Sequence, residues 1–332
     1  MNFLVIGGTG NLSEAAVIQL IRNNNSVHCV TRGSNLLTEK ELESFGCRFH
    51  HISNINSLDS NSLKLVGNKY DFVIDFVSYN TSDIKARLMI FRTMAIKAYV
   101  FISTTAFYNR TSPRSFPHVE DEIDVSSNWD YAFSKYQAEQ TFNELSNSMP
   151  FKTLTIRLGH TLGSSIPVYL GNPGLAYIDH LLSGSPIPFI GSPYYPWSVG
   201  TASGLASLLI LLPEVLPSLP HNLTFHYSGI VTTWNEMYST LYSSLSIGNP
   251  EYKFFSFEDV YSIVPSWIPS VLHHKIYPDL YDCSKMQLYF PLPTHDSIES
   301  IVSNACRVTI SRGREKFYTT NLNRLTSLVT TA

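Results

Sequence analysis

Apolar positions in the first half of the chain form short β-branched runs, which alternate with longer segments whose apolar residues recur at helical spacing. The runs predict strands at 3–7, 26–32, 47–52, 71–77, 98–104 and 152–158. The longer segments predict helices from near Asn11 or Leu12 to 23, at 83–97 and at 131–146. Alternation of this kind is typical of a parallel sheet covered by helices on both faces. We therefore predict an α/β fold with a doubly wound parallel sheet.

The pattern changes near residue 165, where segments rich in Pro, Ser, Tyr and Gly begin. We predict a nucleotide-binding domain over 1–164 and a smaller, mostly substrate-binding domain over 165–332. A strand-like run at 223–229 predicts that the segment near 196–230 returns to the first domain.

Composition narrows the class of partner. The 332-residue chain has a net charge of −3, which gives no electrostatic case for a nucleic-acid or membrane partner, and a small-molecule substrate fits better. The longest apolar run, 204–212, is too short to cross a bilayer, which takes about 20 residues. The N-terminus has no basic signal-peptide region, so we expect a cytoplasmic protein. Neither the four cysteines nor the histidines show metal-ligand spacing, and no metal is expected.

A glycine-rich loop follows the first predicted strand and precedes a helix. Its spacing is G-x-x-G-x-x-S, with Ser13 where a small residue packs the helix onto the strand. Such a turn in a Rossmann-type sheet lets the backbone approach a pyrophosphate at the positive end of the helix. The expected contacts are Gly7, Thr9, Gly10, Asn11 and Leu12.

The end of the second strand favours NADP(H) over NAD(H). NAD-binding folds usually place an acid there for the ribose hydroxyl, whereas this chain has Thr31, Arg32 and Ser34. Arg32 can pair with a 2′-phosphate, although an exposed arginine at a strand end is often only solvated.

Tyr131 and Lys135 lie four residues apart, on one face of a predicted helix. A phenol has a pKa of about 10, and a nearby ammonium group would favour its ionised form. The pair alone also fits an ordinary amphipathic turn. Ser103, Thr104 and Thr105 add hydroxyl groups at the end of the fifth strand, where ligands of such sheets bind.

Together these segments resemble the extended short-chain dehydrogenases/reductases, in the NAD-dependent epimerase/dehydratase family. The matching segments are 7–13, 71–77, 101–108, 131–135 and 156–163. The resemblance implies that Thr104, four residues before Tyr108, orients the substrate oxygen. It also implies that Tyr131 is the general acid/base and that Lys135 is its partner. Both residues are expected to contact the cofactor as well, since Lys135 can also hold the nicotinamide ribose.

The same resemblance implies further cofactor contacts and an assembly. Phe76, Val77 and Ser78 would line the adenosine half, and Asn54 stands where many relatives have an aspartate. Leu158 and His160 would lie near the nicotinamide. A homodimer through the helices at 83–97 and 131–146 is a further possibility.

The substrate is constrained by a gap in charge, because no Lys or Arg occurs between Arg157 and Lys253. Relatives that hold a nucleotide diphosphate use basic residues from the second half. This stretch instead offers Tyr169, Tyr177, His180, Phe189, Tyr194, Tyr195 and Trp197. A small, weakly charged substrate is favoured. The alternative is that these aromatics form core and that Lys253, Lys275 or Arg312 binds a diphosphate.

We therefore expect an NAD(P)-dependent oxidoreductase that transfers hydride at a carbinol or carbonyl carbon. A redox-neutral nucleotide-sugar epimerase or dehydratase is the first alternative, since it shares that step. A non-catalytic relative that binds a cofactor or RNA is the second, and the basic, aromatic segment 313–321 is its only support.

Overall fold

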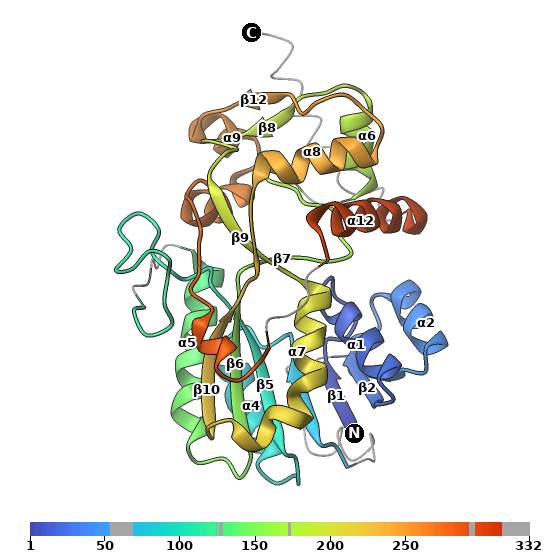
Figure 1. Ribbon diagram of the computed structural model, residues 1–332, viewed down its shortest axis with the longest axis vertical. Coiled ribbons are helices and arrows are strands. Elements are labelled where there is room, and N and C mark those ends of the chain that lie inside the picture. Colours follow the sequence, from blue (N-terminus) through green and yellow to red (C-terminus); the bar gives the residue numbers. More distant parts are fainter. Residues whose placement is uncertain (54–68, 124, 126–128, 172–173, 292–295, 314–332) are drawn as a thin grey trace.

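The computed structural model describes residues 1–53, 69–123, 125, 129–171, 174–291 and 296–313. Seven parallel strands form the central sheet in the order β3-β2-β1-β4-β5-β6-β10 (Figure 1). Their bounds are β1 Asn2–Ile6, β2 Ser26–Thr31, β3 Arg48–His51, β4 Phe72–Asp75, β5 Ala98–Thr104, β6 Lys152–Leu158 and β10 Asn222–Tyr227. The predicted doubly wound sheet is confirmed, and β10 contains most of the predicted strand 223–229.

Helices cover both faces of this sheet. They are α1 Ser13–Arg22, α2 Leu36–Ser44, α4 Thr81–Phe91, α5 Asp130–Ser146 and α7 Ala202–Val215. Side chains alternate along a strand, so Phe3 and Val5 of β1 pack in the α1 and α7 cluster while Leu4 and Ile6 pack in the α4 and α5 cluster. Burial on both faces explains why inner strands such as β1 and β4 are almost continuously apolar.

Several predicted helix boundaries differ from the structure. Helix α4 begins at Thr81 because the Asn80 side chain caps it by accepting a hydrogen bond from the Asp83 amide. It ends at Phe91, six residues before the predicted end, and the chain turns so that the Lys97 amide donates to the Asp71 carbonyl beside β5. Helix α1 begins at Ser13 rather than at Asn11 or Leu12.

The second half adds two small sheets and further helices. One sheet has the order β11-β9-β7 and the other pairs β12 with β8. The strands are β7 His160–Leu162, β8 Ile187–Phe189, β9 Pro196–Thr201, β11 Ile230–Thr233 and β12 Tyr252–Phe254. The helices are α6 Leu175–Leu182, α8 Trp234–Ser244, α9 Phe257–Ile263, α10 Ile268–Ser270, α11 Ser284–Gln287 and α12 Ile298–Arg312. Short 3-10 turns occupy Leu216–Ser218 and Pro265–Trp267, and a π-helical turn, η4, occupies Val271–Lys275.

An aromatic core fills this second half. Tyr169, Tyr177, Phe189 and Trp197 are buried in it, and Tyr169 stacks on Phe189 with ring centroids 3.7 Å apart. These four residues therefore serve packing, as the alternative interpretation of the aromatic stretch held. No described helix is long and apolar enough to cross a membrane.

Candidate active site

A cavity of about 450 Å³ lies at the carboxyl ends of the central strands. It is lined by most of the residues that the sequence singles out, namely Gly7, Gly10, Asn11, Leu12, Phe76, Val77, Thr104, Tyr131, Lys135, Leu158 and His160. Four other predicted contacts, Thr9, Arg32, Ser34 and Ser78, do not line it. Asn54 lies outside the described residues.

The glycine loop is shaped for close backbone approach. Gly7 has a φ of +87°, and a Cβ built there would lie 2.3 Å from Cγ1 of Val77, so a side chain is excluded. Ser13 holds the loop together, since its hydroxyl donates to the Gly7 carbonyl at 2.6 Å and accepts from the Gly10 amide at 2.9 Å.

Backbone donors remain at the mouth of this loop. Within the part of the chain that the structure describes, the amides of Asn11 and Leu12 donate no hydrogen bond, and both residues line the cavity. They precede the positive end of α1. This arrangement fits a pyrophosphate, as the sequence predicted.

Thr104 and Tyr131 meet in the cavity. Thr104 is the last residue of β5, and Tyr131 lies in the first turn of α5. Burial raises the pKa of Tyr131, and the nearby Thr104 hydroxyl lowers it by a smaller amount. The net pKa is therefore above its ordinary value. We expected Lys135 to lower this pKa, and the structure shows the opposite net direction because desolvation dominates.

Lys135 lies one helical turn further along α5 and is buried. Its ammonium group donates to the carbonyls of Ser78 at 2.9 Å and Ile102 at 2.7 Å, so it ties the loop after β4 to β5. Burial lowers its pKa to about 8, although the charges of Asp75 and Glu139 act in the other direction.

The loop after β4 is built on a buried carboxylate. Asp75 accepts hydrogen bonds from the amides of Val77 and Ser78, from the Ser78 hydroxyl at 2.5 Å and from the Tyr99 hydroxyl at 2.6 Å. Arg87 of α4 forms an ion pair with the same carboxylate at 3.3 Å. The Ser78 side chain thus points into this network, while Val77 and Tyr79 face the cavity.

A second buried ion pair fixes α5 against the sheet. Glu139, one turn beyond Lys135, accepts from both Nε and Nη2 of Arg157 on β6, at 2.9 and 2.6 Å. It also accepts from the Ser103 hydroxyl at 2.6 Å. The Ser103 hydroxyl is therefore engaged by Glu139. Thr104, the next residue, lines the cavity together with Tyr131.

The end of β2 carries a polar network beside the cavity. Thr31 donates to Glu39 of α2 at 2.6 Å, and the second oxygen of Glu39 pairs with His51 at 2.8 Å. Arg32 is exposed. Burial raises the pKa of Tyr79 on the cavity wall, and the charge of Arg32 partly offsets that effect.

The basic residues of the second half have separate positions. Arg312 forms ion pairs with Glu14 and Glu41 and lies outside the cavity. Lys275 lines the cavity, where its ammonium group donates to the carbonyls of Val168 at 3.0 Å and Tyr169 at 2.7 Å. Burial lowers its pKa to about 8. Most of the segment 313–321 lies outside the described residues.

Several cavity residues were not predicted as site residues, chiefly Tyr79, Trp129, Ser270 and His274. Tyr79 directly follows the predicted contact Ser78, and Trp129 lies two residues before Tyr131, so both could have been predicted from their neighbours in the sequence. Ser270 and His274 come from more than 100 positions after Tyr131, and no spacing rule connects them to it. No group of three or more His, Cys, Asp or Glu among the described residues is placed to hold a metal ion.

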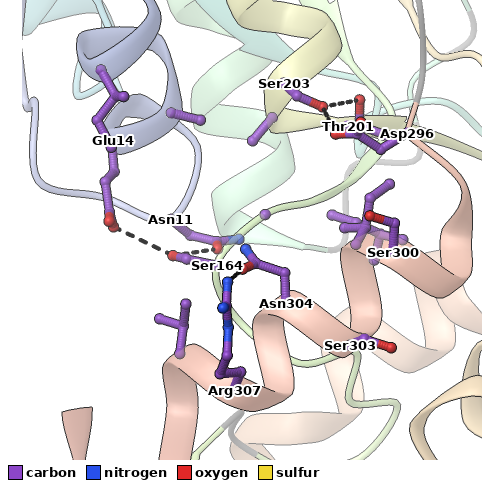
Figure 2. A pocket seen from close by; sticks show the side chains of 17 residues that line it. Asn11, Glu14, Ser164, Thr201, Ser203, Asp296, Ser300, Ser303, Asn304 and Arg307 are labelled. Atoms are coloured by element: carbon purple, nitrogen blue, oxygen red, sulfur yellow. Dashed lines mark hydrogen bonds between the residues drawn. The ribbon is translucent and has the colours of Figure 1, made fainter. Parts of the chain in front are cut away.

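A second cavity of about 570 Å³ lies between α1, the N-terminus of α7 and helix α12 (Figure 2). Asn11 belongs to both cavities, and its side chain accepts a hydrogen bond from the Ser165 amide at 2.8 Å. Arg307 of α12 bonds to Asn304 of the same helix at 2.8 Å, as Figure 2 shows. The predicted catalytic residues lie in the first cavity, which is therefore the candidate active site.

Several solved structures with the same architecture are named as nucleotide-sugar epimerases. UDP-glucose 4-epimerase from Stenotrophomonas maltophila, solved with NAD and formylated UDP-arabinopyranose, is 15% identical with a TM-score of 0.75. The enzyme from Thermotoga maritima, solved with UDP-glucose, is 17% identical with a TM-score of 0.72. The enzyme from Bifidobacterium longum, solved with NAD+ and UDP, is 13% identical with a TM-score of 0.69. Each comparison covers 95% of this chain and 100% of the other.

At these identities the likeness shows the fold alone. No curated protein sequence matches the chain significantly. The model of the NAD-dependent epimerase/dehydratase family, however, matches residues 3–197, which is more than half of the chain. The matched region includes the glycine loop and the predicted Thr104, Tyr131 and Lys135. The resemblance found in the sequence is thus confirmed, and the chain belongs to the NAD-dependent epimerase/dehydratase family.

Proposed function

We propose that the protein is an NAD(P)-dependent oxidoreductase of the extended short-chain dehydrogenase type, acting at a carbinol or carbonyl carbon of a small, weakly charged metabolite. The observation that supports this most is that Thr104, Tyr131 and Lys135 line the same cavity as the glycine loop. The net charge of −3 supports a small-molecule substrate in place of a nucleic acid.

In this proposal each side chain has a separate task. Gly7, Gly10, Asn11 and Leu12 bind the dinucleotide through the backbone, and a bound dinucleotide supplies the hydride chemistry. Thr104 donates a hydrogen bond to the substrate oxygen, and Tyr131 exchanges a proton with that oxygen. Lys135 supplies a positive charge near the phenol and holds the loop at Ser78 in place.

Removal of the Tyr131 hydroxyl tests the assigned acid/base. In Tyr131→Phe we expect NADPH affinity to stay within about twofold, and turnover to fall by about 100-fold or more, because proton transfer is lost. The control is Tyr136→Phe on the same helix, whose ring packs on Phe107 and does not line the cavity. Turnover of Tyr131→Phe at the wild-type rate would refute the role of Tyr131.

We further propose a preference for NADP(H). Two features support it: Arg32 is exposed beside the cavity wall, and the carboxylate of Glu39 is already engaged by Thr31 and His51. Arg32→Asp should weaken NADPH binding by about tenfold or more and leave NADH binding nearly unchanged. Arg92→Asp, an exposed change at the end of α4, is the control. Equal losses for both cofactors would refute the preference.

A redox-neutral nucleotide-sugar epimerase is the second candidate. The three solved structures described above favour it, since all of them bear the name UDP-glucose 4-epimerase. Such an enzyme would retain its dinucleotide through turnover, whereas a net oxidoreductase exchanges it. Mass spectrometry of the dinucleotide released from freshly purified protein distinguishes the two: a retained NAD(H) supports the epimerase and contradicts both the net oxidoreductase and the NADP(H) preference.

A further inference from the structure

The second half of the chain contributes few residues to the candidate active site. Among the described residues that line this cavity, only Ser270, His274 and Lys275 lie beyond Thr161. All three come from α10 and the π-helical turn η4 that follows it. Any substrate group that extends toward the second half therefore meets this short segment.

A buried carboxylate fixes the orientation of His274. Asp279 is fully buried, and its Oδ2 accepts hydrogen bonds from Nε2 of His274 at 2.8 Å and from the Tyr281 hydroxyl at 2.5 Å. Its Oδ1 accepts from Nε of Arg110 at 2.8 Å. The imidazole also stacks on Trp197, with ring centroids 4.9 Å apart.

This environment selects one neutral tautomer of the imidazole. The positive charge of Arg110 helps to hold the pKa of Asp279 well below its ordinary value, so the carboxylate is ionised and can only accept hydrogen bonds. Burial, with the Arg110 charge, lowers the pKa of His274 to about 4, so the ring is neutral at pH 7. Its single proton must then be on Nε2, and Nδ1 carries a lone pair.

That lone pair has no acceptor role inside the protein. Within the described residues Nδ1 of His274 takes part in no hydrogen bond, and it is not among the buried polar atoms that lack a partner. The His274 side chain is 12% exposed, and the surface that it exposes belongs to the cavity wall. A ligand in the cavity can therefore reach the atom.

We propose that His274 contacts the substrate directly, its Nδ1 accepting a hydrogen bond from a donor group such as a hydroxyl, with Asp279 as the positioning residue. The proposal rests on the proposed function, since it takes the reacting substrate to bind in this cavity. A phosphate or carboxylate oxygen would face the lone pair unfavourably, so the substrate presents a hydroxyl or amino group here. An analogue without that donor would leave Nδ1 desolvated and unpaired, which makes His274 a determinant of specificity.

The tautomer is tested without any substrate. Long-range 1H–15N spectra of the 15N-labelled full-length chain at pH 7 should show His274 protonated on Nε2 only, with the signal assigned by its absence in His274→Gln. The glutamine amide can still donate to Asp279, so the variant is expected to fold. A proton on Nδ1 in the wild-type protein would overturn the proposal, whatever the protein catalyses.

The contact is tested by specificity. A panel of UDP-sugars and hydroxy acids is assayed through the absorbance change of NADP+ or NAD+, and each substrate found is compared with its deoxy analogues. The wild-type protein should prefer the hydroxylated compound by at least about 100-fold in kcat/KM over one deoxy analogue. In His274→Gln that ratio should fall to below about tenfold, mainly through KM, while His273→Gln keeps the wild-type ratio. A ratio unchanged in His274→Gln would overturn the proposal.

The two proposals fail differently. Absence of nicotinamide cofactor binding by the wild-type protein would refute the proposed function. In that case the 1H–15N spectra still show whether Nδ1 of His274 is unprotonated and can accept a hydrogen bond from a ligand.

Discussion

Burial of charged side chains is the main residue-scale feature of the candidate site. Lys135, Glu139 and Arg157 are all buried around the ends of β5 and β6. An isolated charge in such a place is costly, so each of these residues has hydrogen bonds or an opposite charge close by. Their effects should therefore be visible in pH dependence and in stability.

Cofactor binding should weaken at alkaline pH. Because burial lowers the pKa of Lys135 to about 8, its ammonium group loses its proton above that pH. We expect the Kd for NADPH, measured by fluorescence titration, to rise up to tenfold per pH unit above about 8. The pKa of Lys275 is also lowered to about 8, so Lys275 could cause the same pH dependence. If Lys135 is responsible, Lys275→Gln should show the same rise of Kd above about pH 8 as the wild-type protein. A Kd constant from pH 7 to 9.5 would contradict the assignment.

Removing one partner of the Glu139–Arg157 ion pair should destabilise the protein more than removing both. Arg157→Met leaves a buried carboxylate without its partner and should lower the free energy of unfolding by about 3–5 kcal/mol. The double change with Glu139→Gln should cost clearly less. Urea unfolding, followed by tryptophan fluorescence, measures the free energy of unfolding of the single and the double variant. The control is Lys97→Met, which breaks a partly exposed ion pair with Asp71 and should cost below about 1 kcal/mol. Additive losses in the double variant would argue against the coupling.

Spacing placed Tyr131 and Lys135 on one helix face, and the family resemblance singled out Thr104, but neither predicted all of their surroundings. Tyr131 and Lys135 share a helix face, and Thr104 ends a strand, so local periodicity was enough to bring them to one edge of the sheet. Ser78 was predicted beside the cofactor, yet its side chain turns toward Asp75, which a one-dimensional pattern does not encode. His274 depends on Asp279 and Arg110, whose proximity arises only from tertiary packing.

At the scale of elements, helix α12 joins the two halves of the chain. Arg312, in its last turn, pairs with Glu14 of α1 and Glu41 of α2, and one of its hydrogen bonds to Glu14 measures 3.0 Å. Glu14 lies in the first turn of α1, directly after the glycine loop. The contact thus links the end of α12 to the element that positions the loop.

Loss of this contact should be measurable. We expect Arg312→Ala to lower the free energy of unfolding by about 1–2 kcal/mol, with a smaller effect in 1 M salt because the ions are partly exposed. Arg307→Ala, five residues earlier on α12, loses only a hydrogen bond to Asn304 among the described residues and should cost below about 0.5 kcal/mol. Thermal unfolding at low and high salt compares them, and equal losses for the two variants would contradict the proposed link.

Helices and strands were predicted well where the pattern of apolar residues is strong. The inner strands of the central sheet, such as β1, β4 and β5, match their predicted ranges closely, because burial on both faces gives strongly apolar runs. The helix at 83–97 was predicted too long, since the residues after Phe91 retain apolar character while the chain turns. In the second half, strands of three residues such as β8 and β12 are too short for a pattern to emerge.

At the scale of the whole molecule, we propose two functional parts that meet at the cavity, with the boundary near residue 164 and with α7 and β10 returning to the first part. We also propose a homodimer through α4 and α5, whose exposed apolar side chains include Met89 and Phe133. Sedimentation of the wild-type protein should then give twice the monomer mass, and Met89→Glu with Phe133→Glu should give monomers. A monomeric wild-type protein at micromolar concentration would contradict the dimer.

The central claim is that the cavity between the glycine loop and Tyr131 binds a nicotinamide dinucleotide. The most direct measurement is fluorescence titration of the protein, stripped of any bound cofactor, with NADPH and with NADH. The wild-type protein should bind NADPH with micromolar or tighter affinity. Gly7→Val, whose side chain would collide with Val77, should bind neither cofactor, while Gly248→Ala, at an open position away from the cavity, should behave as wild type. A wild-type protein that binds neither dinucleotide would contradict the account.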